Sequence, residues 1–165
     1  MITVLTIVHV AISLVGISAG FVVMWGLLVS KRLNTWTAIF LAATTATSVT
    51  GFFFPFDKIL PSHIVGIISL VVLAIAILAL YALHLAGSWR WIYVVSAIVA
   101  LYLNVFVGVV QAFQKVPLLA SLAPTQSEPP FLIAQAVVLV IFVVLGIAAV
   151  RSFHPPTDAL ALSVR

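Results

Sequence analysis

The stretch WIYVVSAIVALYLNVFVGVVQAF, residues 91–113, contains 23 consecutive residues without a charged side chain. A helix of that length is about 34 Å long, enough to cross the roughly 30 Å hydrocarbon core of a bilayer. Small or polar side chains recur along it at steps of three and four, at Tyr93, Ser96, Ala100, Asn104, Gly108, Gln111 and Lys115. They share one helix face, and because lipid cannot satisfy polar groups, we expect that face to meet other helices.

The composition of the whole chain indicates a membrane protein. Hydrophobic residues make up 65% of the 165 residues and charged residues 6%, whereas about a quarter of a soluble domain is charged. Apolar stretches of about spanning length cover residues 2–29, 36–56, 64–86, 91–113 and 131–150, and none alternates like a strand. We predict an all-α integral membrane helical bundle with five transmembrane helices. Residues 1–151 would form a single transmembrane domain and residues 152–165 a short cytoplasmic tail.

The basic residues predict the orientation of this bundle. With five crossings, one side receives Lys31, Arg32, Arg90, Arg151 and Arg165, and the other receives Lys58 and Lys115. Cytoplasmic loops carry the excess of Lys and Arg, so we expect the N-terminus outside and the C-terminus inside. The first apolar stretch is too long for a signal peptide and no basic residue precedes it, so we expect it to remain as a helix.

Small residues on the first helix predict a packing face. His9, Ser13, Gly16 and Gly20 follow one another at steps of four, three and four. Gly16 and Gly20 also form a small-xxx-small pair, which lets another backbone approach closely. We predict tight packing within the bundle here, with a face for a homo-oligomer or a membrane partner protein as the alternative.

Polar side chains gather toward the predicted outer face. They are expected to line an outward-facing pocket formed by His9, His63, Asn104, Gln111 and Gln135, with Asp57 and Glu128 at its rim. The alternative is that these groups bond one another and fix the helix register. In the loop at residues 115–130, we expect the first half to lie on the membrane surface, and Thr125 or Ser127 to cap the last helix.

Three kinds of function fit these residues. The leading prediction is non-enzymatic binding of a partner protein or a small apolar ligand in the outward pocket. One alternative is a haem b- or quinone-associated redox protein using His9 and His63, because buried histidines are the usual axial ligands. His63 and His84 cannot share one iron, because 21 residues of helix separate them by about 31 Å. The other alternative is a small transporter or channel component.

Several chemistries lack the residues they need. The chain has no cysteine, and no predicted span contains a carboxylate. The sequence shows neither a Ser-His-Asp or metalloprotease spacing nor a nucleic-acid motif. No ligand spacing predicts a metal on the outer face. We therefore expect neither a catalytic centre nor a nucleic-acid partner, and the net charge of +4 is expected to reflect membrane topology.

Four segments carry a resemblance: HVAISLVGISAG (9–20), LPSHIVGIISL (60–70), WRWIYVVSAIVALYLNVFV (89–107) and LAPTQSEPPF (122–131). They resemble small, multi-span bacterial inner-membrane proteins of unknown function, over nearly all of residues 5–153. The resemblance implies a bacterial inner membrane, with a periplasmic N-terminus on the orientation above. A fainter likeness is to bacterial membrane families with a histidine early in the first helix and often another after the first basic loop. This chain has His9, but no histidine in KRLNTW (31–36), which weakens a haem interpretation.

Overall fold

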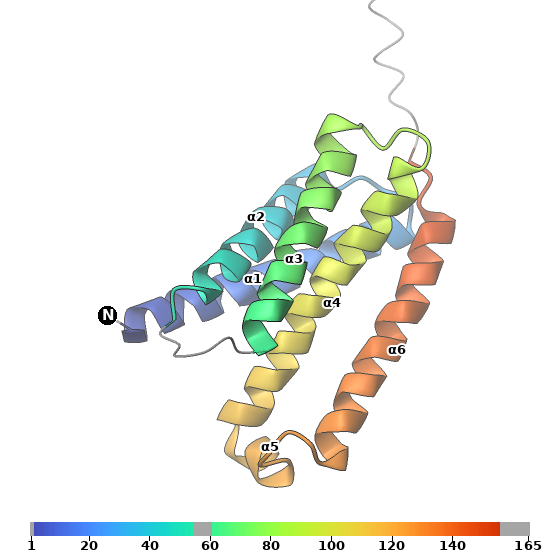
Figure 1. The fold of residues 1–165 in the computed structure, drawn as a ribbon. Helices are drawn as coiled ribbons and strands as arrows, with labels where there is room; N and C mark the ends of the chain where they lie inside the picture. Colours follow the sequence, from blue (N-terminus) through green and yellow to red (C-terminus); the bar gives the residue numbers. More distant parts are fainter. Residues whose placement is uncertain (1, 55–60, 156–165) are drawn as a thin grey trace, which may run out of the picture.

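The computed structural model describes residues 2–54 and 61–155, and only the backbone of Pro61 and Ser62. All regular structure in these residues is helical (Figure 1). The elements are α1 (Ile2–Leu28), α2 (Asn34–Gly51), α3 (Pro61–Ile77), η1 (Leu78–Ala82), α4 (Trp89–Lys115), α5 (Pro117–Leu122) and α6 (Pro129–Ser152). The predicted all-helical bundle is therefore confirmed.

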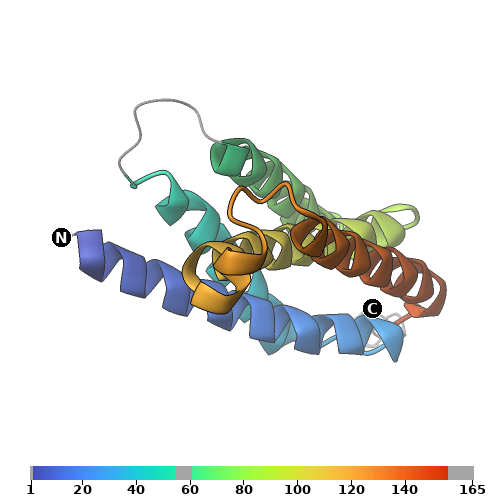
Figure 2. The ribbon, with the colours of Figure 1, turned by 90° about the horizontal axis from the view of Figure 1, so that it is seen from below.

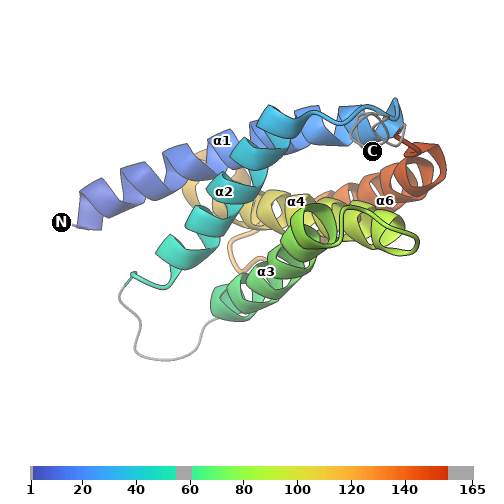
Figure 3. The same ribbon diagram turned by 90° about the horizontal axis from the view of Figure 1, so that it is seen from above.

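The long helices run back and forth between two ends of the bundle (Figures 1 and 3). The central helix is α4, which contacts α1, α2, α3 and α6. The last long helix, α6, lies on the side of α4 away from α3 and packs against α4 and α1. Seen from below, the short α5 lies at the end of the bundle where α4 finishes and α6 begins (Figure 2). This order leaves much of α6 facing outward.

The structure supports four of the five predicted transmembrane helices. Within the residues described, four helices are long and apolar enough to cross a membrane: Ile2–Leu28, His63–Ala82, Trp89–Lys115 and Pro129–Ser152. The predicted span at 36–56 corresponds to α2, which ends at Gly51 and whose 18 residues include six threonines and one serine. These hydroxyl groups make α2 too polar to be identified as a membrane-spanning helix by its composition.

The predicted third span also ends earlier than expected. After Ile77 the helix widens into the π-helical turn η1 and finishes at Ala82, whereas the prediction extended to Ala86. His84 and Leu85 have φ values of 48° and 60°. Two consecutive residues in the left-handed region cannot continue a right-handed helix, so the chain turns here toward α4.

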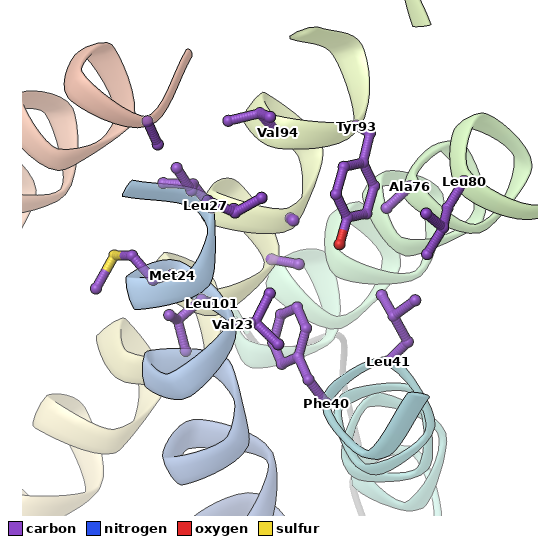
Figure 4. Packing of buried hydrophobic residues seen from close by; sticks show 14 of the residues in the cluster. Val23, Met24, Leu27, Phe40, Leu41, Ala76, Leu80, Tyr93, Val94 and Leu101 are labelled. Atoms are coloured by element: carbon purple, nitrogen blue, oxygen red, sulfur yellow. The ribbon is translucent and has the colours of Figure 1, made fainter. Parts of the chain in front are cut away.

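The apolar core is built from buried side chains of α1, α2, α3, η1, α4 and α6, and part of it is shown in Figure 4. Phe40 of α2 points between α1 and α4, beside Val23 of α1, and its side chain is 1% exposed. Gly20 makes this arrangement possible, because a Cβ built there would lie 2.4 Å from Leu101 Cδ1 and 3.0 Å from the Phe40 ring. Only the missing side chain of Gly20 lets the three helices approach this closely.

Contacts among connecting segments define the end of the bundle that we call the basic end, which carries Lys31, Arg32, Arg90 and Arg151. The Arg90 guanidinium donates a hydrogen bond to the carbonyl of Phe153, so the start of α4 is held against the end of α6. The backbone N–H of His154 donates to Ser30 Oγ, 2.8 Å away. Residues 156–165, which include most of the predicted tail, lie outside the described residues.

The opposite end contains the segment between α4 and α6. The expected surface segment forms the helix α5. The expected caps, Thr125 and Ser127, do not cap α6, because Glu128 occupies the N-cap position and prolines begin the helix. Thr125 and Ser127 instead donate hydrogen bonds to the Glu128 carboxylate. A carboxylate can accept several donors from a tight loop, which explains why it organises this turn.

Candidate functional site

His9 belongs to a polar contact between α1 and α2. Its Nδ1 lies 2.8 Å from Thr50 Oγ1, and its ring meets Phe54 edge-on, with centroids 5.2 Å apart. One turn along, Ser13 Oγ donates to Thr47 Oγ1 at 3.4 Å. Steps of three to four residues on both helices place these groups opposite one another. His9 thus contributes to a polar seam that joins the two helices.

His63 lies in the first turn of α3 and is buried, with 8% of its surface exposed. Its ring packs against Phe52 just beyond the end of α2, with centroids 5.6 Å apart and planes inclined by 32°. Both His9 and His63 thus approach residues 50–54, but each contacts a different side chain. The haem or quinone interpretation of this pair stays a prediction.

Asn104 is buried near the middle of α4. A Cβ built at Gly16 would lie 3.1 Å from Thr44 Oγ1 and 3.2 Å from Asn104 Nδ2. Gly16 therefore provides the space into which a hydroxyl from α2 and an amide from α4 both reach. Both polar atoms are buried without a hydrogen-bond partner in the described part of the chain.

The two glutamines lie nearer the end that carries α5. Gln135 is buried between α6 and α4, and its Nε2 donates to the Phe106 carbonyl at 3.2 Å, while its Oε1 is unpaired among the described residues. Gln111 is half-buried on α4. His9, His63, Asn104 and Gln135 thus contact different neighbours, and the outward pocket they were predicted to share stays a prediction.

The two predicted rim residues differ in what the structure describes. Asp57 lies outside the described residues. Glu128 is half-buried just before α6. Desolvation works to raise the pKa of its carboxyl group, but hydrogen bonds from Thr125 and Ser127 outweigh this effect and lower the pKa. In the described residues, no three histidine or acidic side chains are grouped to hold a metal ion. The Glu128 carboxylate therefore stabilises the loop at residues 125–128 through these hydrogen bonds.

A groove with space for a ligand lies between α4 and α6, with a volume of ≈ 370 Å³. Its α4 wall consists of Val95, Ile98, Val99 and Tyr102, and its α6 wall of Arg151 and six residues between Leu139 and Val150. Ile98 and Phe142 are buried, whereas Val95, Leu139, Val143 and Ile147 are exposed. The groove thus has an apolar floor and an apolar rim that opens sideways, away from the other helices.

Gly146 keeps this groove open along the α6 wall. A Cβ at this position would lie 3.7 Å from Ile98 Cγ2, so a methyl group would just touch the floor and a larger side chain would occupy the groove. The lining contains two polar side chains: Tyr102, whose ring lies 5.7 Å from that of Phe142, and Arg151 at the end of α6. The arrangement can hold an elongated apolar molecule and offers one positive charge at the basic end.

The sequence prediction did not include this groove. Its lining residues look like ordinary lipid-facing positions, because α6 is apolar on every side and only Gln135, Phe142 and Ala149 are buried. The available signal was the combination of Gly146 with Arg151 one and a half turns later. Neither residue type is unusual in a membrane helix, so that signal alone does not single out a ligand site.

No protein-family model, curated protein or solved structure matches this chain.

Proposed function

We propose that this protein is a multi-pass membrane protein that binds a lipid-soluble molecule in the groove between α4 and α6 and does not act as an enzyme. The observation that carries the proposal is the groove itself: ≈ 370 Å³, almost entirely apolar, and lined by exposed residues on its rim. Ligand sites typically have volumes of about 300–1,000 Å³ and mostly apolar walls with a few polar groups. The rim faces the hydrocarbon region, so the ligand would enter sideways from the bilayer.

The length of the groove favours an elongated ligand. From Leu139 to Arg151 the α6 wall covers 13 residues, and the 12 steps between them correspond to about 18 Å of helix. A flexible hydrocarbon chain can follow such a groove between two helices better than a compact molecule can. We therefore expect a molecule with one long apolar chain.

We further propose that α2 crosses the membrane with the four apolar helices, which restores five crossings. Several of its hydroxyl groups face protein: Thr37 and Thr44 are buried, and Ser48 Oγ lies 3.1 Å from Ser69 Oγ of α3, within hydrogen-bond distance. Thr50 and Ser48 also donate to carbonyls one turn earlier, which satisfies a hydroxyl within the helix. A polar helix shielded in this way need not meet lipid with its polar face.

With five crossings, the excess of Lys and Arg puts the basic end on the cytoplasmic side of a bacterial inner membrane. The N-terminus then lies on the periplasmic side. Because the chain has no cysteine, single cysteines can test this topology without further changes. A cysteine at Ser30 should react with a membrane-impermeant maleimide only after the inner side is exposed, and one at Gln126 should react in intact cells. If α2 does not cross, the two positions would respond alike.

Ligand binding can be tested with palmitate that carries a photoactivatable diazirine in its chain. The purified protein is irradiated with this probe in detergent or nanodiscs, and labelled peptides are identified by mass spectrometry. We expect saturable labelling of residues 95–102 and 139–150, which excess palmitate removes. Even, non-saturable labelling over all exposed apolar faces, including Ile7 and Ile133, would contradict the proposal.

A pair of variants on α6 provides the control. Gly146→Phe places a ring in the groove and should remove the saturable labelling. Val144→Phe adds the same ring two residues away, at an exposed position that does not line the groove, and should leave the labelling unchanged. Equal labelling of the two variants would show that the probe does not occupy the groove.

A further inference from the structure

The end of the groove carries the charge that would select its ligand. Arg151 lines the groove in the last turn of α6, and its side chain is exposed. In the described residues it forms neither a hydrogen bond nor an ion pair. A guanidinium group at membrane-surface depth has five donors that match the oxygens of a phosphate group, so this arginine is available to a ligand.

The neighbouring segments add to the positive potential at this end. Arg90 holds the start of α4 against the end of α6 through the Phe153 carbonyl, and the Tyr93 and Phe153 rings lie 6.2 Å apart. The N-terminus of the long helix α4 therefore lies against the end of α6, two residues beyond Arg151, and a helix N-terminus favours an anion. The α4 side of this contact thus attracts negative charge, whereas the last carbonyls of α6 favour cations such as Arg90 and Arg151.

Negative charge within the described protein lies far away. The chain has three acidic residues, and Asp57 and Asp158 lie outside the described residues. Glu128 begins α6 at its other end, 23 residues before Arg151, which corresponds to about 34 Å of helix. The charge at the groove mouth is thus not matched by the described acidic side chain.

We propose that the groove binds an anionic phospholipid, with one acyl chain between α4 and α6 and the phosphate group at Arg151. This inference rests on the proposed function and adds the class of ligand. The apolar walls recognise the chain and the arginine recognises the headgroup, which lies at the depth where basic side chains between membrane helices contact anionic lipids. The competing role of Arg151 is favourable interaction with the C-terminus of α6, which requires no lipid.

Two photoactivatable lipids with identical acyl chains separate these roles. Phosphatidylglycerol and phosphatidylcholine, each with a diazirine in one chain, are incorporated at trace amounts into phosphatidylcholine nanodiscs that contain the whole protein. We expect groove peptides to be labelled about fivefold more by phosphatidylglycerol, the ratio that one basic side chain near the surface supplies. In Arg151→Gln the ratio should fall to near one, while labelling by phosphatidylcholine shows that the groove is intact.

Lys31→Gln is the matched control, because it removes the same charge from the basic end and Lys31 does not line this groove. It should leave the labelling ratio unchanged. A ratio near one in the unmodified protein, or an equal fall in both variants, would overturn the inference and leave only a general attraction of the basic end. Absence of saturable groove labelling by either lipid would instead refute the proposed function.

Discussion

Adding one methyl group at Gly20 tests how closely α1 packs against α2 and α4. In the structure the new Cβ would lie 2.4 Å from Leu101 Cδ1 and 3.0 Å from two Phe40 ring carbons. Leu101 and Phe40 are each 1% exposed, so neither side chain can move without displacing other core residues. Gly20→Ala should therefore strain the centre of the bundle.

The expected magnitude combines two opposing effects. Overpacking of a filled core typically costs about 1–3 kcal/mol, and replacing glycine by alanine in a helix returns up to about 1 kcal/mol. We expect Gly20→Ala to lower the free energy of unfolding by roughly 1–2 kcal/mol. Gly108→Ala is the matched control, because its Cβ would lie 3.7 Å from Ile17 Cδ1, an ordinary contact. This variant should be at least as stable as the unmodified protein.

Reversible unfolding in mixed micelles with increasing dodecyl sulfate, followed by circular dichroism, measures these free energies. A double variant attributes the strain to its contact: Leu101→Ala alone should cost about 2–5 kcal/mol, but Gly20→Ala should cost little in that background, because the opposing methyl group is gone. The reasoning is refuted if Gly20→Ala and Gly108→Ala unfold alike, or if the two substitutions at 20 and 101 are simply additive.

Three further outcomes follow from polar contacts and backbone geometry. Thr50→Val removes the hydroxyl partner of His9 and should lower the free energy of unfolding by about 0.5–1.5 kcal/mol. The hydroxyl of Thr44 is unpaired among the described residues, so Thr44→Val should have a smaller effect in the same unfolding assay. The lowered pKa of Glu128 means that its hydrogen bonds persist above the ordinary value of 4.5 and are lost as the pH falls through the folded pKa. Hydrogen-exchange protection of residues 125–127 should decrease there, but should not depend on pH in Glu128→Gln. His84→Gly removes the cost of a side chain at φ 48° and should raise the free energy of unfolding by about 1 kcal/mol. Thermal unfolding would measure this gain, and a loss of stability would contradict it.

The polar stripe on the fourth predicted helix shows how far local patterns reach. Tyr93, Ser96, Ala100 and Asn104 are all buried, as their spacing along one face predicted. The outer part of the same stripe is less enclosed: Gln111 is half-buried and Lys115 is exposed. Spacing identifies a face, but the neighbouring helices decide how much of that face they cover.

The second helix shows the opposite case. Its position in the chain was predictable. Its six threonines, however, make α2 too polar to be identified as a membrane-spanning helix by composition. Its polar side chains bond α1 and α3, and these contacts come from residues about 20 to 40 positions away in sequence. Hydropathy summed along one segment contains no information about such partners.

The sequence by itself determined that this protein is a bundle of apolar helices, and it placed most helix ends within a few residues. Both depend on local properties: the cost of burying charge, the length of an apolar run, and prolines such as Pro129 that begin a helix. Only the tertiary structure decided that α4 and α6 leave a groove at Gly146 that ends at Arg151. Because α6 is apolar on all sides, its sequence favours no particular face, and only packing against α4 and α1 determines which residues form the groove.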